Sequence, residues 1–429
     1  MTRKKYIKEK LEKENIETGD KIRIQTKNVK REGILMPHHE FSDEKIITIK
    51  LDNGYNIGLE IEKDSKISLI EKHKKVVKKP KEIPFDKNKP TVSVISTGGT
   101  IACYVDYRTG AVHSASSARD LAFSVPEVFE ICNLKTQVAY QILSENIDVK
   151  HWQELAKKIA NELNNGAKGV IVPHGTDTLG YTSAALSFML KNLSGPVVLV
   201  GSQRSSDRPS SDAAQNLIAS ANVASKTDIG EVVAVMHSKT SDTKMDIHKG
   251  TKVRKFHTSR RDAFKTVNDI PIGFFENGKI KFSKDYRKKT KGKVEVNTKM
   301  EEDVSMIYYY PGLKPDDIPE KKGIVLIGTG LGHISEKLIP RIKELTKKGT
   351  IFVMVSQCFF GRVDMSVYST GRDLVKSGIL PLEDMLPETA YVKLMWALGQ
   401  SDKRSKIEKI MKENIAGEIT NRTRSDVFL

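Results

Sequence analysis

From residue 91 onward, the chain alternates short apolar runs with longer stretches of helical periodicity, and this alternation limits its possible folds most strongly. Nearly uninterrupted apolar runs are typical of strands buried on both faces, as in parallel sheets covered by helices. The runs lie at 91–96, 169–175, 196–202 and 231–237. The helical stretches between them, at 149–166 and 181–195, each end at a glycine. The pattern therefore predicts an α/β body with a parallel sheet and right-handed crossovers.

A second set of apolar runs follows a basic stretch at 284–299. These runs lie at 306–312, 323–333 and 350–358, again with helical stretches between them. We therefore expect two lobes, a larger parallel-sheet lobe over 91–285 and a smaller α/β lobe over 301–429. Residues 286–300 would form a basic, structureless linker between the lobes.

The first 75 residues have a different character. Short runs with partial alternation lie at 19–26, 31–37, 45–51 and 55–61, separated by turn residues. They predict a small SH3-like or OB-like β-barrel behind an N-terminal helix, over 1–75; we favour the SH3-like form. Residues 76–90 are rich in lysine and proline and have little apolar surface to bury, so we expect a solvated linker.

The composition restricts the partners and the compartment. The 429-residue chain carries 71 Lys and Arg against 54 Asp and Glu, a formal net charge of +17 at pH 7. Such a charge favours an anionic partner such as nucleic acid, although lysine-rich surfaces also serve solubility and heat resistance. The 3 cysteines are too scattered for a disulfide framework, and the sequence lacks a signal peptide and an apolar span of ~20 residues. We therefore expect a soluble cytoplasmic protein that contacts no membrane.

Polar loops follow the predicted strands of the larger lobe, where open parallel sheets bind their ligands. They lie at 96–102, 143–148, 173–180 and 201–212, and together they are rich in hydroxyl groups and glycine. A further segment, 259–266, carries Lys265 next to Phe264. A threonine hydroxyl attacks poorly unless a base or a desolvated lysine lies beside it, and Lys265 could serve in that role. The loops therefore predict a threonine-nucleophile site.

We expect no metal site. His38, His39 and Glu40 adjoin in a turn of the small barrel, without a distant third ligand. The sequence also lacks a P-loop or another recognisable ATP motif. We therefore expect no cofactor in this chain.

Two pentapeptides carry a resemblance to a known family. The segments TGGTI (97–101) and HGTDT (174–178) resemble the two signatures of the bacterial-type L-asparaginases, in the same order and at a similar distance. The resemblance implies a larger and a smaller α/β lobe, with Thr100 as the nucleophile. It also implies that Thr176, Asp177 and Lys265 form a second hydroxyl–carboxylate–lysine set.

The same resemblance implies the substrate-binding residues. Ser144 and Glu145 would hold the α-amino and α-carboxylate groups, and Gly99 would help to form an oxyanion hole. The loop GTGLGHIS (328–335) resembles a second-lobe loop that approaches a neighbouring subunit's pocket, so His333 is a further candidate.

One departure from the asparaginase pattern concerns the lid. The family has a tyrosine about a dozen residues after the nucleophile, on a mobile lid, that helps to activate the threonine. Counting from Thr100 reaches His113, whereas Tyr104 and Tyr107 come earlier. Either the lid is realigned or Thr100 is activated differently, so we assign no lid residue.

The N-terminal β module, the tether and the C-terminal stretches 356–400 and 416–429 resemble the D subunits of archaeal glutamyl-tRNA(Gln) amidotransferases. This second resemblance implies a glutaminase that hydrolyses glutamine, or asparagine, and supplies ammonia to an E subunit. The E subunit would use ATP and Mg²⁺ to convert Glu-tRNA(Gln) to Gln-tRNA(Gln). The implied assembly is a homodimer of this chain within an α2β2 heterotetramer.

Two other functions remain open from the sequence. The chain could be a free-standing L-asparaginase or glutaminase with an unrelated basic appendage. It could also be an RNA-binding protein with an inactive amidase body, although the intact candidate residues argue against that. Which amide is preferred, how ammonia reaches the partner, and whether the barrel or the lysine-rich linkers touch tRNA are not readable from the sequence.

Overall fold

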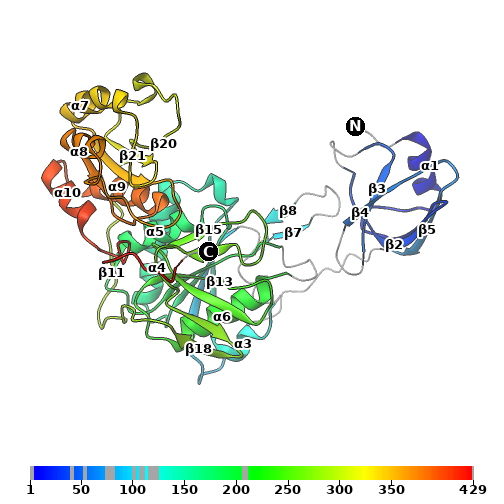
Figure 1. Cartoon of the computed structure of the whole chain (residues 1–429). Coiled ribbons are helices and arrows are strands. Elements are labelled where there is room, and N and C mark those ends of the chain that lie inside the picture. Colours follow the sequence, from blue (N-terminus) through cyan, green and yellow to red (C-terminus); the bar gives the residue numbers. More distant parts are fainter. Residues whose placement is uncertain are drawn as a thin grey trace.

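The computed structural model of the chain describes residues 4–38, 43–51, 56–72, 83–98, 103–105, 112–114, 125–204 and 211–427. Figure 1 shows an N-terminal module in blue, a larger lobe in cyan to green, and a smaller lobe in yellow to red. Among the residues that the structure describes, no helix is long and apolar enough to cross a membrane.

The N-terminal module is an antiparallel sheet packed against one helix. Strand order is β4-β3-β2-β1-β5, so four strands form a meander and the fifth returns beside the first. The elements are α1 (Lys5–Lys13), β1 (Lys21–Gln25), β2 (Lys30–Leu35), β3 (Ile46–Lys50), β4 (Asn56–Glu60) and β5 (Lys66–Glu71). Helix α1 buries Ile7 and Leu11 against the sheet's isoleucines. The sequence predicted the first four strands and missed β5, which pairs with β1.

The larger lobe is built on an eight-stranded sheet with the order β18-β17-β14-β13-β12-β10-β6-β9. Its parallel part consists of β6 (Thr91–Gly98), β9 (Asn133–Ile142), β10 (Val170–Pro173), β12 (Val197–Val200) and β13 (Val232–His237). Side chains alternate between the two faces, so Val170 and Val172 pack on one side and Ile171 on the other. Helices cover both faces, as the apolar runs predicted.

One face packs against α4 (Val149–Asn164) and α5 (Leu179–Met189), and the other against α3 (Val128–Ile131) and α6 (Ala213–Lys226). Asp148 begins α4 as a capping residue, because its carboxylate accepts hydrogen bonds from the backbone N–H groups of Lys150 and His151. Because the five strands of the parallel part run in the same direction, the loops that follow them lie at one end of the sheet.

The sheet is mixed rather than wholly parallel. Antiparallel strands β14 (Lys244–Lys249), β17 (Gly273–Glu276) and β18 (Lys279–Phe282) extend it beyond β13. Burial alternates along most of β14 and along β17, and β18 is largely exposed, because solvent reaches this end of the sheet. Such strands carry weaker apolar runs, which explains why the sequence did not reveal them.

The smaller lobe has a four-stranded parallel sheet, with the order β20-β21-β22-β23. Its elements are β20 (Val304–Tyr308), β21 (Gly323–Gly328), β22 (Ile351–Ser356), β23 (Ile379–Pro381), α7 (Ile339–Lys347), α8 (Ser369–Lys376), α9 (Pro387–Gln400) and α10 (Arg404–Lys412). Helix α9 packs against α5, and the rings of Phe188 and Trp396 stack 6.1 Å apart. One apolar core therefore runs through both lobes.

Residues 286–300 connect the lobes, but they do not lie free in solvent. The short strand β19 (Glu295–Val296) pairs with β11 (Leu190–Lys191), and the backbone of Lys288 forms an isolated antiparallel β-bridge with that of Ile229. The Tyr286 hydroxyl donates to the Asp228 carboxylate at 2.6 Å. The expectation of a structureless linker is wrong here, because these backbone groups find partners on the larger lobe.

Candidate active site

Three loops of the larger lobe meet where their strands end. The loop after β10 contains the segment 174–178, and the loop after β9 contains the short helix η2 (Ser144–Asn146). The Thr178 hydroxyl donates to the backbone carbonyl of Ser144 at 2.7 Å. A Cβ atom on Gly175 would lie 2.6 Å from the Ser144 Cβ atom, so glycine permits this close packing.

The end of β6 is held against the same loops. The Thr97 hydroxyl donates to the backbone carbonyl of Pro173 at 2.9 Å, and its side chain is buried. Gly98 has a φ of +98°, and a Cβ atom there would lie 2.6 Å from the Ile142 carbonyl oxygen. Thr97 is therefore a structural hydroxyl. The expected nucleophile Thr100 and the expected oxyanion residue Gly99 lie outside the described residues.

A hydroxyl, a carboxylate and a lysine come together in the HGTDT loop. The ammonium group of Lys255 donates to the Thr176 hydroxyl at 2.8 Å and to the Asp177 carboxylate at 2.8 Å. Thr176 is 5% exposed, whereas the Asp177 side chain is 67% exposed. Solvent therefore reaches this set at the Asp177 carboxylate, whereas Thr176 is covered by the protein.

His174, at the start of this loop, is a structural group. Its ring is fully buried, and Nδ1–H donates to the Gly175 carbonyl at 2.6 Å. Burial lowers the pKa of His174 to about 4, so the ring stays neutral at neutral pH. It therefore supports the backbone of the loop without adding a charge.

The lysine in this set is Lys255, and the expectation that Lys265 completes it is wrong in its geometry. The Lys265 ammonium group donates to the backbone carbonyl of Ser238 at 3.1 Å. Both lysines belong to one hairpin, formed by β15 (Val253–Lys255) and β16 (Phe264–Thr266).

The pairing of the hairpin explains the difference. Lys265 lies opposite Arg254, and Lys255 lies opposite Phe264. Residues directly opposite share a face of a hairpin and neighbours along a strand point to opposite faces, so the two lysines face opposite ways. The sequence contained Lys255 in TKVRK (251–255), but nothing local to that stretch gives the pairing.

The predicted substrate-binding residues differ in their surroundings. Ser144 is buried against the HGTDT loop, within the packing just described, and its neighbour Glu145 is exposed. Glu145 therefore lies beside the loop with its carboxylate in solvent. The roles of both residues in binding stay predictions.

His333 lies in the smaller lobe and contacts its own loop. Its backbone carbonyl accepts from the N–H of Thr329 at 2.8 Å, and its ring packs edge-on against Tyr368, with centroids 5.2 Å apart. Both partners belong to the same lobe. A role at the pocket of a neighbouring subunit stays a prediction.

The expected lid region contributes one described hairpin. Strands β7 (Cys103–Val105) and β8 (Val112–Ser114) pair antiparallel, with Tyr104 opposite His113. Two of the residues considered for the lid are thus paired in register, and Tyr107 lies outside the described residues.

The described residues contain no group of three His, Cys, Asp or Glu that could hold a metal ion. His39 and Glu40 of the cluster considered from the sequence are not among them. The arrangement at 174–178 offers charge and hydroxyl groups for acid–base chemistry on a carbonyl substrate, which needs no metal ligands.

Comparison with known proteins divides the chain into three matched parts. "GatD N-terminal domain" matches residues 16–70, "Asparaginase, N-terminal" matches 91–288, and "Glutaminase/Asparaginase C-terminal domain" matches 303–411. The solved thermostable L-asparaginase from Thermococcus kodakarensis is similar with a TM-score of 0.71 and 31% identity, covering 77% of this chain and 100% of its own. L-asparaginase I from Vibrio cholerae has a TM-score of 0.68 and 27% identity, covering 77% of this chain and 99% of its own. The expected asparaginase-like body is therefore confirmed.

Other relatives match the chain along its whole length. The D subunit of the glutamyl-tRNA(Gln) amidotransferase from Pyrococcus furiosus is 52% identical over 439 residues, covering 99% of each chain. The corresponding D subunit from Methanobrevibacter smithii is 45% identical over 438 residues, covering 100% of each chain. The chain therefore belongs to the family of glutamyl-tRNA(Gln) amidotransferase D subunits, in which an asparaginase-like body follows a small N-terminal module.

Proposed function

We propose that this chain is the glutaminase subunit of a glutamyl-tRNA(Gln) amidotransferase, a carbon–nitrogen ligase with glutamine as amido donor. The observation that carries the proposal is the contact of Lys255 with Thr176 and Asp177, in a chain that matches D subunits over its full length. A free-standing asparaginase is less well supported, because the solved asparaginases match only 77% of the chain.

The proposed reaction begins with attack of the Thr100 hydroxyl on the side-chain amide carbon of glutamine. The Thr100 proton passes to the leaving nitrogen, the C–N bond breaks, and ammonia departs as an ester forms on Thr100. Backbone N–H groups near Gly99 and Thr176 would stabilise the negative charge that develops on the carbonyl oxygen. Water then hydrolyses the ester to glutamate and restores Thr100.

The set around Lys255 would serve the proton transfers. The Lys255 ammonium group orients the Thr176 hydroxyl, and Asp177 balances the charge of Lys255. Thr176 would then relay a proton from the water that attacks the ester to the Thr100 oxygen, which leaves as a hydroxyl group when the ester bond breaks. Ser144 and Glu145 would hold the α-amino and α-carboxylate groups, with Asp177 beside them.

The partner would be an E subunit that binds Glu-tRNA(Gln) and uses ATP and Mg²⁺, while this chain needs no cofactor. We propose a homodimer of this chain within an α2β2 complex, located in the cytoplasm with its tRNA substrate. Purification of the native complex followed by mass identification of the partner tests this assembly. Recovery of this chain alone, active and indifferent to tRNA, would favour the free-standing hydrolase instead.

The nucleophile is tested directly with a glutamine-mimicking electrophile. In the assembled complex, peptide mapping should place the adduct on Thr100, and Thr100→Ala should abolish both the adduct and glutamine hydrolysis. Thr97→Ser provides the matched control, because its hydroxyl keeps the backbone contact with Pro173. An adduct on any other residue would contradict the proposed mechanism.

A further inference from the structure

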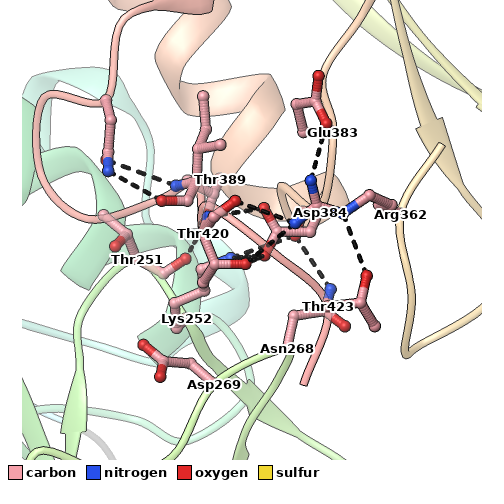
Figure 2. Close-up of polar contacts among 12 residues, drawn as sticks. Thr251, Lys252, Asn268, Asp269, Arg362, Glu383, Asp384, Thr389, Thr420 and Thr423 are labelled. Carbon is pink, nitrogen blue, oxygen red and sulfur yellow. Dashed lines mark hydrogen bonds and ion pairs between the residues drawn. The ribbon is translucent and has the colours of Figure 1, made fainter. Parts of the chain in front are cut away.

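A buried ion pair lies directly beside the strand that carries Lys255. The Lys252 ammonium group is 2.7 Å from the Asp384 carboxylate, and the two side chains are 0% and 2% exposed. Lys252 immediately precedes β15 of the larger lobe, and Asp384 lies between β23 and α9 of the smaller lobe. The pair therefore joins one lobe to the other, as Figure 2 shows, and it does so three residues before Lys255 in the chain.

The C-terminal segment, residues 414–424, completes the coordination of this carboxylate. The backbone N–H of Thr420 donates to one Asp384 oxygen at 2.9 Å, and the Thr420 hydroxyl donates to the other at 2.5 Å. Arg362 holds Thr420 in place by donating to its backbone carbonyl at 3.0 Å. Figure 2 shows Lys252, Thr420 and Arg362 grouped around Asp384.

Further contacts join the smaller lobe to the start of β15. The Thr389 hydroxyl donates to the Thr251 carbonyl at 2.8 Å, and the Asn268 amide donates to the Asp384 carbonyl at 3.0 Å. Asn268 follows β16, so both ends of the hairpin are tied to the same turn of the smaller lobe. The C-terminal segment also touches this point, because the Thr251 hydroxyl donates to the Ala416 carbonyl at 3.1 Å.

These contacts do more than hold the lobes together. The apolar packing of α5 against α9 already joins the lobes through Phe188 and Trp396. A buried ion pair contributes little net stability compared with apolar packing, but it fixes how its two side chains are oriented relative to each other. Loss of one partner leaves an uncompensated buried charge. Burial lowers the pKa of Lys252, and Asp384 opposes that shift by favouring the charged form.

We propose that the C-terminal segment positions the active site through Thr420, Asp384 and Lys252. Thr420 fixes the Asp384 carboxylate, Asp384 fixes Lys252, and Lys252 sets the start of the strand whose last residue is Lys255. Thr420 and Asp384 are thus positioning residues that act on Lys255 from three and two steps away, respectively. This inference rests on the proposed role of Lys255 in amide hydrolysis.

The test replaces Thr420 by valine in the full chain, within its complex. We expect kcat for glutamine hydrolysis to fall about tenfold with KM unchanged within about twofold, because misplacement of a proton-transfer group affects the chemical step more than binding. Amide hydrogen exchange in residues 252–267 should become faster. Thr420→Ser should restore both values, since serine keeps the hydroxyl donor.

Thr350→Val is the matched control. The buried Thr350 hydroxyl also donates to a backbone carbonyl, that of Lys321 at 2.6 Å. Both residues belong to the smaller lobe, and this hydrogen bond is not part of the contacts that lead from Thr420 to the hairpin. Equal effects of both valine variants on kcat and on exchange in 252–267 would overturn the inference. Asp384→Asn provides a second variant and should give a larger loss than Thr420→Val; an unchanged kcat there would also overturn it.

The exchange measurement separates this inference from the proposed function. If the unaltered protein hydrolyses no amide, the proposed function fails, but faster exchange in 252–267 on Thr420→Val would still support the structural coupling. If hydrolysis is normal and exchange in the hairpin does not change, the coupling fails alone.

Discussion

The two faces of the β15–β16 hairpin use the same residue type for different purposes. On one face, Lys255 contacts a hydroxyl and an exposed carboxylate in the HGTDT loop. On the other, Lys265 donates to the Ser238 carbonyl, and Arg254 pairs with Glu388 of the smaller lobe. The difference teaches that the period of two along a strand, rather than the composition of the segment, decides which cation reaches a site.

The surroundings of the two lysines differ in what they leave open. Asp177 beside Lys255 is mostly exposed, so a substrate can reach this set from solvent. On the other face, Lys265 contacts a backbone carbonyl and Arg254 contacts the Glu388 carboxylate. The Lys255 face also buries Phe264 and Thr266, so the solvent-exposed side of the Lys255 set is the part open to a substrate.

The largest expected effect comes from removing each lysine in turn. Lys255→Met should lower kcat/KM for glutamine hydrolysis by about 10³-fold, because the Thr176 hydroxyl loses the group that orients it for proton transfer. Lys265→Met should change kcat/KM by less than about threefold, since it removes a single hydrogen bond to a backbone carbonyl. Steady-state kinetics of the two variants measure the contrast.

Circular dichroism and thermal unfolding of both methionine variants should show that each is folded. If Lys265→Met proved the more damaging variant for catalysis while remaining folded, the assignment of the two faces would be reversed.

The sequence predicted the parts of this site that are local and missed the part that is not. The buried strands before Gly98 and His174 appear as apolar runs, and the HGTDT loop follows one of them directly. The lysine comes from a three-residue strand without an apolar run, and its direction depends on pairing with a strand that begins nine residues later. The antiparallel edge of the large sheet escaped prediction for a similar reason, because half-exposed strands have weak patterns.

The next largest effect concerns the stability that depends on His248, whose buried ring is hydrogen-bonded to Thr266 at 2.8 Å. Burial lowers the pKa of His248 to about 4, below the ordinary value of 6.5. The unfolded chain therefore takes up a proton at this residue below about pH 6.5 while the folded chain does not, so stability falls as pH decreases towards 4. Between pH 6.5 and pH 5 this one group should cost about 2 kcal/mol.

Urea unfolding at pH 7 and pH 5 tests the sign and the size of this change in the free energy of unfolding. The loss of unfolding free energy between the two pH values should be about 2 kcal/mol smaller in His248→Gln than in the unaltered protein. Equal losses in the two proteins would show that His248 is not held neutral by the fold.

The smallest expected effect comes from Arg254, which lies on the same face of the hairpin as Lys265. Its guanidinium group lies 3.2 Å from the Glu388 carboxylate and 4.7 Å from the centre of the Phe359 ring. Arg254→Ala should reduce the free energy of unfolding by about 1 kcal/mol, since both contacts are only partly buried. Arg254→Lys should recover part of that loss, because it keeps the charge but not the planar stacking.

The same Arg254→Ala variant gives the sharpest check on the comparison, because Arg254 is adjacent to Lys255 in the chain yet opposite to it in direction. If direction decides function, kcat/KM should change by less than about threefold, in contrast to Lys255→Met. A loss approaching that of Lys255→Met, in a folded protein, would mean that the hairpin acts as one rigid unit. In that case its anchoring to the smaller lobe, rather than the face on which a side chain lies, would control the active site.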